Sequence, residues 1–537
     1  MESLRERSPR FKRPNDEDRD GGDDDVISLE LFQSVEIKHS SAVSSSPVTL
    51  DVVAYVGGSC WTLDWTPNGS HVACEGRGEK HHAHALRDVG KCKGKAAVQI
   101  WDVCDTGVRM ALGMVHDGGC AHDLKWSPFR GRDWTRIEAS DEESLGTLAC
   151  ARGDGRVETW NVPRPSTRSG ERVFVESKAM FVGVVPGDYG APWRLDWNDV
   201  VPGRLCAGCT SGRVVVWDVP DHESDASPTY PKFVIAAAAH AGPCRAVRWP
   251  KREIPEDENA CANILACGSD YAAKPHLFDL RAPFAPIGDV CERGAKWTLD
   301  MAWLPRGGVV LGMEHSDRSS AKSIRGETKQ TAANVRSRAL VVQFDLTATE
   351  GEDSNPTSMH PVPGRGTVWS VDARAGFDPA CAASMFACAT SNGVVCVKPM
   401  RYVSKRLRDV KAFNFDVFAG LLAHDVESKR ACESNPVEPP ECFEFITSNE
   451  QVPADAELYP PLEAAKPGTR DAPTTAQYCA RWSKDRDGGW WLASVGEAGF
   501  LRLQKFDSNW IETKLGTLER AHRSSGEKSG AKRAKKT

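Results

Sequence analysis

Short apolar runs recur along the chain in a fixed order, separated by polar turns. Each unit opens on an alternating strand that ends at or near a tryptophan, as in residues 61–65 (WTLDW), 124–128 (LKWSP), 193–197 (WRLDW) and 246–250 (AVRWP). A strand of small residues follows, as in residues 147–151 (TLACA) and 205–209 (LCAGC). The next strand ends in an aromatic residue and an acid or amide, as in residues 98–102 (VQIWD), 157–161 (VETWN) and 214–218 (VVVWD). This order predicts a repeated all-β unit of a few short strands.

Seven copies of the unit can be counted, and repeats of this kind are typical of a WD-type β-propeller. The copies occupy residues 57–103, 116–163, 191–220, 240–283, 297–345, 366–390 and 478–503. Gly155, Gly212 and Gly393 stand between consecutive strands, where a tight hairpin needs a positive φ. We therefore predict a seven-bladed propeller whose blades carry loops of very different length.

The predicted propeller spans residues 48–518, with insertions at about 317–338 and 401–474. Residues 49–56 (TLDVVAYV) are β-prone and precede the first copy, so we expect them to pair with the seventh blade and close the ring. The charged ends, residues 1–47 and 519–537, are expected to be disordered.

Within the insertion at 401–474, the stretch from about residue 412 to 475 begins apolar, with residues 413–422 (FNFDVFAGLL), and continues into a proline-rich half. One interpretation is a partner-binding arm. The other is a packed extension that covers an exposed blade edge. The sequence does not separate the two.

Composition narrows the class of protein. The chain has 18 cysteines, and they stand singly beside alanine, valine and leucine in predicted strands, which favours small buried side chains over a disulfide framework. No run of eighteen apolar residues occurs, and the first residues are charged, so neither a membrane span nor a secretory signal is predicted. These features lead us to expect a soluble cytoplasmic or nuclear protein.

Charge is concentrated in short segments of a chain whose formal net charge is −6. The last nineteen residues hold seven basic and two acidic side chains, and this tail is typical of a nuclear localisation signal or a phosphate-binding arm through Lys528, Lys532, Arg533, Lys535 and Lys536. A second basic segment follows the sixth copy and offers candidate loop contacts with a partner or DNA through Arg401, Lys405, Arg406 and Arg408. The alternative for each segment is a plain solvated stretch.

Sequence signals for catalysis or metal binding are weak. Cys74, His81, His82, His84 and Cys92 lie close together, but their spacing fits no common zinc site, and Cys74 belongs to a predicted strand. Cys206 and Cys209 form a Cys-x-x-Cys along a strand, where positions i and i+3 face opposite sides. No nucleophile elbow, Walker loop or His-Glu-x-x-His sequence occurs. We therefore predict no catalytic residue, no metal and no cofactor.

Two kinds of residue are assigned to the fold. His116, Asp117, His240 and Asp270 are interpreted as structural hydrogen-bonding residues rather than acid–base catalysts. The recurring tryptophans are interpreted as structural blade residues: Trp65, Trp101, Trp126, Trp160, Trp197, Trp217 and Trp249.

The recurring sequence segments resemble those of WD-repeat proteins. Together they are similar to the segments of the propeller subunit of transcription factor IIIC. The residues that carry this resemblance are 57–65 (GGSCWTLDW), 97–103 (AVQIWDV), 116–120 (HDGGC), 124–126 (LKW) and 366–372 (GTVWSVD). The resemblance implies a nuclear, non-enzymatic scaffold subunit of the complex that binds internal promoters of RNA polymerase III genes. It also implies docking onto a second propeller subunit, with DNA contacted indirectly or through basic tails.

Two other classes stay open. Residues 278–281 (FDLR) are a degenerate match to the Trp-Asp-x-Arg signature of substrate receptors of cullin-type ubiquitin ligases. An enzyme on a propeller scaffold is disfavoured because no set of acid, base and nucleophile can be assembled from the sequence.

Overall fold

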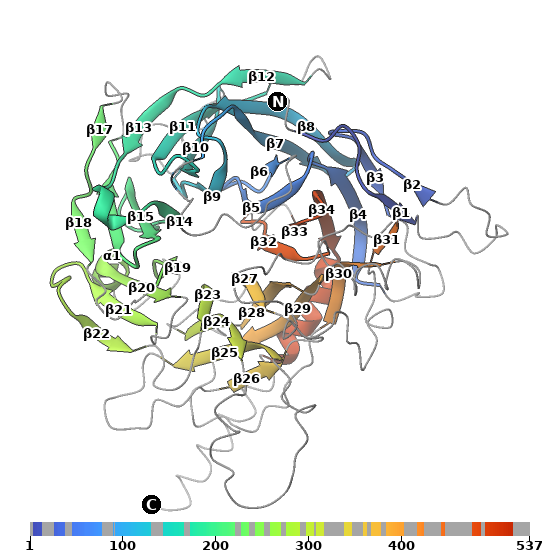
Figure 1. The fold of residues 1–537 in the computed structure, drawn as a ribbon. Coiled ribbons are helices and arrows are strands. Elements are labelled where there is room, and N and C mark those ends of the chain that lie inside the picture. The colour runs from blue at the N-terminus through green and yellow to red at the C-terminus, as the bar shows by residue number, and fades with distance from the viewer. Residues whose placement is uncertain are drawn as a thin grey trace, which may run out of the picture.

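The strands that open each repeat lie innermost in a ring of sheets (Figure 1). The computed structural model describes residues 4–12, 26–37, 46–77, 90, 92–129, 143–165, 172–220, 227–235, 242–251, 258–269, 275–289, 297–304, 308–315, 338–345, 358–361, 367–376, 383–391, 393–401, 416–423, 442–445, 475–484 and 489–518. Within these residues the strands form seven sheets, and each innermost strand contacts the next around the centre. The prediction of an all-β propeller is confirmed. We name each sheet by its innermost strand.

Three consecutive sheets contain four strands each. The β14 sheet consists of β14 (Pro192–Trp197), β15 (Arg204–Cys209), β16 (Val214–Asp218) and β18 (Phe233–Ile235). The β19 sheet consists of β19 (Cys244–Arg248), β20 (Ile264–Ser269), β21 (His276–Asp279) and β22 (Pro286–Asp289). The β23 sheet consists of β23 (Trp297–Leu304), β24 (Gly308–His315), β25 (Arg338–Asp345) and β26 (Ser358–Pro361). Two short helices lie nearby in sequence, η2 (Gly187–Tyr189) before β14 and α1 (Glu258–Asn263) before β20.

The other four sheets carry further strands at the outer edge. The β5 sheet consists of β5 (Ser59–Trp65), β6 (His71–Arg77), β7 (Ala96–Cys104), β8 (Gly107–His116) and β12 (Val173–Glu176). The β9 sheet consists of β9 (Ala121–Trp126), β10 (Ser144–Arg152), β11 (Val157–Pro163), β13 (Ala179–Gly183) and β17 (Pro228–Thr229). The β27 sheet consists of β27 (Val368–Ala375), β28 (Ala383–Thr390), β29 (Val394–Arg401), β30 (Asp416–Ala423), β31 (Cys442–Phe445), β1 (Arg10–Lys12) and β2 (Val26–Ile27). The β32 sheet consists of β32 (Gln477–Trp482), β33 (Trp490–Gly496), β34 (Phe500–Phe506), β4 (Val48–Tyr55) and β3 (Ser34–Glu36).

The second strand of a sheet is covered on both faces by its neighbours. Every residue of β10 and of β28 is buried, and both strands are rich in alanine, cysteine and serine. Small side chains allow adjacent sheets to pack closely around the ring. The hairpin turns also agree with the sequence, because Gly155, Gly212 and Gly393 have φ values of +89°, +85° and +89°.

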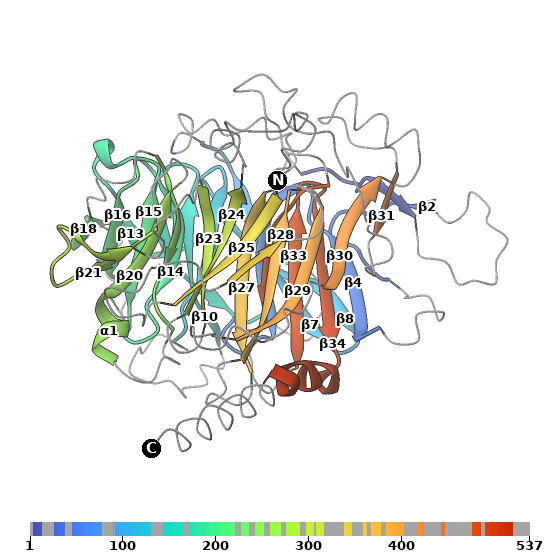
Figure 2. The same cartoon turned by 90° about the horizontal axis from the view of Figure 1, so that it is seen from below.

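The ends of the chain meet in the β32 sheet. Strand β4 pairs antiparallel with β34 from Phe500↔Tyr55 to Phe506↔Val48, which confirms the predicted closing strand. A helix at residues 508–518 follows β34, and its buried Ile511, Leu515 and Leu518 pack beside β28 and β33. Figure 2 shows this helix on one face of the ring.

Part of the N-terminal segment differs from the prediction of disorder. Strand β1 pairs in parallel with β31, and β3 pairs with β4. Phe11 is fully buried, with ring centroids 5.0 Å from Phe445 and 5.6 Å from Phe500. The expectation was wrong for residues 4–12 and 26–37 because a few apolar side chains in a charged run find a preformed surface on the propeller. Residues 13–25 and the C-terminal tail 519–537 lie outside the described residues.

The apolar start of the second insertion is also part of a sheet. Strand β30 pairs antiparallel with β29, and β31 pairs with β30. For these two strands the structure shows the packed extension rather than a free arm. The segment expected as an insertion therefore contains the fourth strand of the β27 sheet.

Candidate functional site

The innermost strands place a charged or polar residue beside each core tryptophan. In Asp64-Trp65, Lys125-Trp126 and Asp196-Trp197 the two side chains face opposite ways, because successive residues of a strand alternate. The tryptophans are buried among residues of neighbouring sheets. These charged residues, together with others on the innermost strands, form what we call the inner belt. It comprises Asp64, Asp123, Lys125, Asp196, Arg248, Asp300, Asp372 and Arg481.

The carboxylates of the inner belt connect each innermost strand to the next. The backbone N–H of Trp126 donates to Asp64 Oδ2 over 2.8 Å, and that of Leu195 donates to Asp123 Oδ2 over 2.9 Å. The same bond recurs at three further places around the ring, from Trp249 to Asp196, from Val371 to Asp300 and from Trp482 to Asp372. Hydrogen bonds from backbone amides to a charged acceptor are among the stronger ones in proteins. The belt carboxylates therefore join neighbouring sheets at their inner edges.

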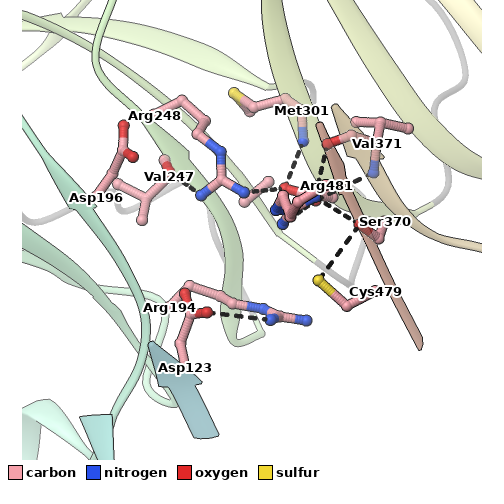
Figure 3. A network of polar contacts seen from close by, with 12 residues as sticks. Asp123, Arg194, Asp196, Val247, Arg248, Met301, Ser370, Val371, Cys479 and Arg481 are labelled. Carbon is pink, nitrogen blue, oxygen red and sulfur yellow. Dashed lines mark hydrogen bonds and ion pairs between the residues drawn. The ribbon is translucent and has the colours of Figure 1, made fainter. Parts of the chain in front are cut away.

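Asp300 on β23 pairs with two arginines of the belt, Arg248 and Arg481. Figure 3 shows the polar network around these two arginines. Asp300 Oδ1 lies 2.6 Å from Arg248 Nη2, and its Oδ2 lies 3.0 Å from Arg481 Nη2. Arg481 comes from β32, so its guanidinium reaches past β27 and also donates to Ser370 Oγ over 2.6 Å. Burial alone raises the pKa of Asp300, but the guanidinium groups of Arg248 and Arg481 lower it to about 2. The carboxylate is therefore held ionised.

Burial and neighbouring charges also oppose one another at Asp64, Lys125 and Asp372, and the net direction of the pKa shift differs among them. Asp64 is buried, which raises its pKa, but Lys484 Nζ lies 2.9 Å from Oδ2 and the net effect lowers the pKa. Burial lowers the pKa of Lys125, although Asp64 opposes that shift. Burial raises the pKa of Asp372, which accepts the Trp482 N–H. Since these groups are engaged with one another and with the backbone, their chemistry is that of a structural network.

Aromatic side chains gather at the other end of the same innermost strands. Trp193 stacks on His122 with ring centroids 5.7 Å apart, and the Arg245 guanidinium lies 4.4 Å from the Trp193 ring centroid. Trp369 lies 5.9 Å both from Arg245 and from Tyr478. Trp61 lies 5.5 Å from Tyr478 and packs against the Ala191–Trp193 cluster. The contacts run from strand to strand, so these side chains pack against one another at that end of the innermost strands.

No family model matches the chain. General transcription factor 3C polypeptide 2 of Pongo abelii is 26% identical over 319 residues, which is 52% of this chain and 33% of that protein. The Homo sapiens protein of the same name is 25% identical over 321 residues, with the same shares covered. The chain is similar to general transcription factor 3C polypeptide 2. It spans about a third of the length of these curated relatives, and the match together with the propeller confirms the resemblance inferred from the sequence.

For a chain similar to general transcription factor 3C polypeptide 2, the basic segments are the candidate contacts with a partner or DNA. Most of these segments lie outside the described residues. This holds for Lys405, Arg406 and Arg408, and for the whole C-terminal set from Lys528 to Lys536. Arg401 is the last residue of β29. The assignment of these residues to partner, DNA or nuclear-import contacts stays a prediction.

The tryptophans assigned to the blades are all buried: Trp65, Trp101, Trp126, Trp160, Trp197, Trp217 and Trp249. Some also bridge sheets through the indole N–H. Trp65 Nε1 donates to the carbonyl of Arg481 over 2.9 Å, and Trp197 Nε1 donates to that of Lys125 over 2.9 Å. In both cases the acceptor is the carbonyl of a belt residue on the preceding innermost strand. The tryptophans and the belt residues therefore both link neighbouring sheets.

His116 makes the buried hydrogen bond that its structural interpretation predicts. Its Nε2 lies 2.8 Å from Glu75 Oε2, and the other carboxylate oxygen accepts the Ala121 N–H over 2.8 Å. Asp117 pairs with Arg152. His240 and Asp270 lie outside the described residues. The buried Glu75 could not be identified from sequence, because an acid in a strand of small residues has no motif of its own.

The cysteine and histidine signals give no metal site in the described part of the chain. Cys74, Cys206 and Cys209 are buried free thiols, and burial raises the pKa of each. His81, His82 and His84 lie outside the described residues. Among the helices that the structure describes, none is long and apolar enough to cross a membrane.

Proposed function

We propose that the chain is a non-enzymatic interaction subunit of a transcription factor IIIC complex and serves RNA polymerase III transcription in the nucleus. The observation that carries this proposal is the similarity to general transcription factor 3C polypeptide 2 over about half of the chain. The proposal takes each of the seven sheets as one blade of a closed WD-type ring. Its partners are other subunits of the complex, above all a second propeller.

The geometry supports binding on the outside of the ring rather than chemistry at its centre. The carboxylates of the inner belt are engaged by ion pairs and by backbone N–H groups, and the aromatic side chains contact one another. A propeller whose inner polar groups are engaged in this way offers its rims and loops as contact surfaces. In the proposed mechanism the propeller assembles partners, and the basic tail adds salt-sensitive contact with DNA.

The first test is affinity purification of the tagged full chain from nuclear extract, with the co-purifying proteins identified by mass spectrometry. Recovery of the other transcription factor IIIC subunits in comparable amounts is the expected result. Recovery of a cullin and its adaptor instead would contradict the proposal.

The ligase-receptor alternative has its own test at Arg281. This residue follows β21, and its guanidinium pairs with Asp279 at 2.9 Å from Nε to Oδ1 while remaining largely exposed. If the chain were a receptor, Arg281→Ala would abolish adaptor binding. If Arg281→Ala leaves the set of co-purifying proteins unchanged, the transcription assignment stands.

A further inference from the structure

The outer edges of the sheets are of two kinds. Four sheets carry a further strand beyond the fourth: β12 on β8, β17 on β13, β3 on β4 and β31 on β30. The three consecutive sheets β14, β19 and β23 end, among the described strands, at β18, β22 and β26. An uncovered edge strand presents backbone groups that a further strand can bond. One arc of the rim thus differs from the rest (Figure 1).

The β12–β8 pair shows how a strand is received. Strand β12 pairs in parallel with β8, and Phe174 lies against Gly113 of the edge strand. A Cβ at Gly113 would lie 2.3 Å from Phe174 Cδ1, so only glycine leaves room for the ring. A glycine in the receiving strand therefore makes a notch for an aromatic side chain of the added strand.

Strand β22 also contains a glycine. Among the residues that the structure describes, a Cβ built on Gly288 meets no atom within 4 Å. The neighbouring Ile287 is 53% exposed, and Phe284 just before the strand is 93% exposed. Exposed large apolar side chains close together in sequence at an edge strand are typical of a protein-interaction surface.

Charge on this arc indicates what the incoming strand carries. Arg281 pairs with Asp279, and Lys232 pairs with Asp218. In each pair the cation is the more exposed member, at 62% for Arg281 and 56% for Lys232. Of the two, Arg281 is close in sequence to Phe284 and β22, so its exposed guanidinium offers positive charge that is complementary to an acidic residue.

Three of the four added strands have a composition that fits this surface. Strand β12 reads Val-Phe-Val-Glu, β31 reads Cys-Phe-Glu-Phe and β3 reads Ser-Val-Glu. Each combines an apolar side chain with a glutamate, whereas β17 reads Pro-Thr. We propose that β22 accepts an extended segment of a partner protein as a further strand, with an aromatic side chain over Gly288 and an acidic residue beside Arg281. This proposal concerns the rim alone and does not rest on the transcription assignment.

The test uses the purified full chain and a fluorescent peptide with the sequence of residues 170–179 (GERVFVESKA), which contains β12. We expect saturable binding by fluorescence anisotropy. Gly288→Leu fills the space above this glycine without a clash among the described residues, and it should weaken binding at least about fivefold. Val173→Ser, an exposed apolar residue away from β22, should leave the affinity unchanged.

Several results would overturn the proposal. One is equal binding by Gly288→Leu, which would place the peptide on another edge such as β8. A second is equal binding by the peptide with Ser in place of Phe, and a third is the absence of binding at millimolar peptide. The last is a dimer of the free chain, seen by sedimentation, that Gly288→Leu dissociates, because the occupant would then be a second copy.

Discussion

At the scale of single residues, Asp300 is the group on which the inner belt depends most. It accepts hydrogen bonds from Arg248, Arg481 and two backbone N–H groups, those of Met301 and Val371. Removal of its charge leaves two buried guanidinium groups without their carboxylate. We expect Asp300→Asn to lower the free energy of unfolding by about 3 kcal/mol, because breaking a buried ion pair from one side is costly.

The measurement is urea unfolding followed by tryptophan fluorescence. Asp105→Asn is the matched control, since the exposed Asp105 also pairs with a cation, Lys505, at 2.7 Å. An exposed pair contributes less than about 1 kcal/mol, so this variant should unfold like the wild type. Equal decreases in the free energy of unfolding for the two variants would show that the buried ion pairs contribute no more to stability than the exposed pair.

The same carboxylate gives a pH prediction. The pKa of Asp300 is lowered from 3.8 to about 2 in the folded chain. Its contribution to stability is therefore complete above pH 3.8 and is lost as the pH falls through that interval to about 2. We expect the difference in unfolding free energy between wild type and Asp300→Asn to shrink over this range. A difference that stays constant from pH 6 to the acid limit would contradict the assignment.

At the scale of elements, the N-terminal strand β1 holds the outer strand β31 in place. Phe11 is the buried contact, in edge-to-face packing with Phe445 and Phe500. Phe11→Ala removes a large buried side chain, so we expect the amides of β1 and β31 to exchange at least about tenfold faster. Hydrogen exchange with mass spectrometry measures this, with Phe284→Ala as the control at an exposed phenylalanine. Unchanged protection of β31 would show that β1 is dispensable.

The elements also show what the sequence can and cannot predict. The innermost strands, the hairpin glycines and the closing strand were predictable because their patterns are local and repeated. Strands β1, β3 and β31 were missed because they are short and stand in charged or proline-rich surroundings. Their β structure depends on edges that exist only once the propeller has formed.

The candidate site was likewise only partly predictable from the sequence. The charged residue before a tryptophan can be read from the repeated segments, but the distant ion-pair partner of Asp300 cannot. Arg481 lies 181 positions further along the chain and contacts Asp300 only because the sheets close into a ring. The rim at Gly288 was missed too, since a glycine between Ile287 and Asp289 reads as an ordinary turn residue.

At the scale of the whole molecule, the ring is fastened by a buried ion pair between the two ends of the chain. Asp51 on β4 accepts from Arg502 Nε at 2.9 Å and Nη2 at 2.6 Å, and Gln504 donates to it at 3.0 Å. We expect Asp51→Ala to lower the unfolding free energy by about 3–5 kcal/mol. The double variant Asp51→Leu with Arg502→Met should recover most of this loss, because no buried charge is then unpaired.

Differential scanning calorimetry of the three proteins measures both effects. A single variant with wild-type Tm would show that β4 is held by its backbone pairing alone. A double variant as unstable as the single one would assign the loss to packing rather than to charge.

The pairing of β4 with β34 also has a consequence during synthesis on the ribosome. Strand β4 is translated more than 400 residues before its partner. At roughly 5–20 residues per second, about 20 to 90 seconds pass before that partner emerges. Throughout this interval the nascent chain exposes Val52, Val53 and Tyr55, which the finished ring buries. We therefore expect β4 to be the segment that molecular chaperones must protect longest.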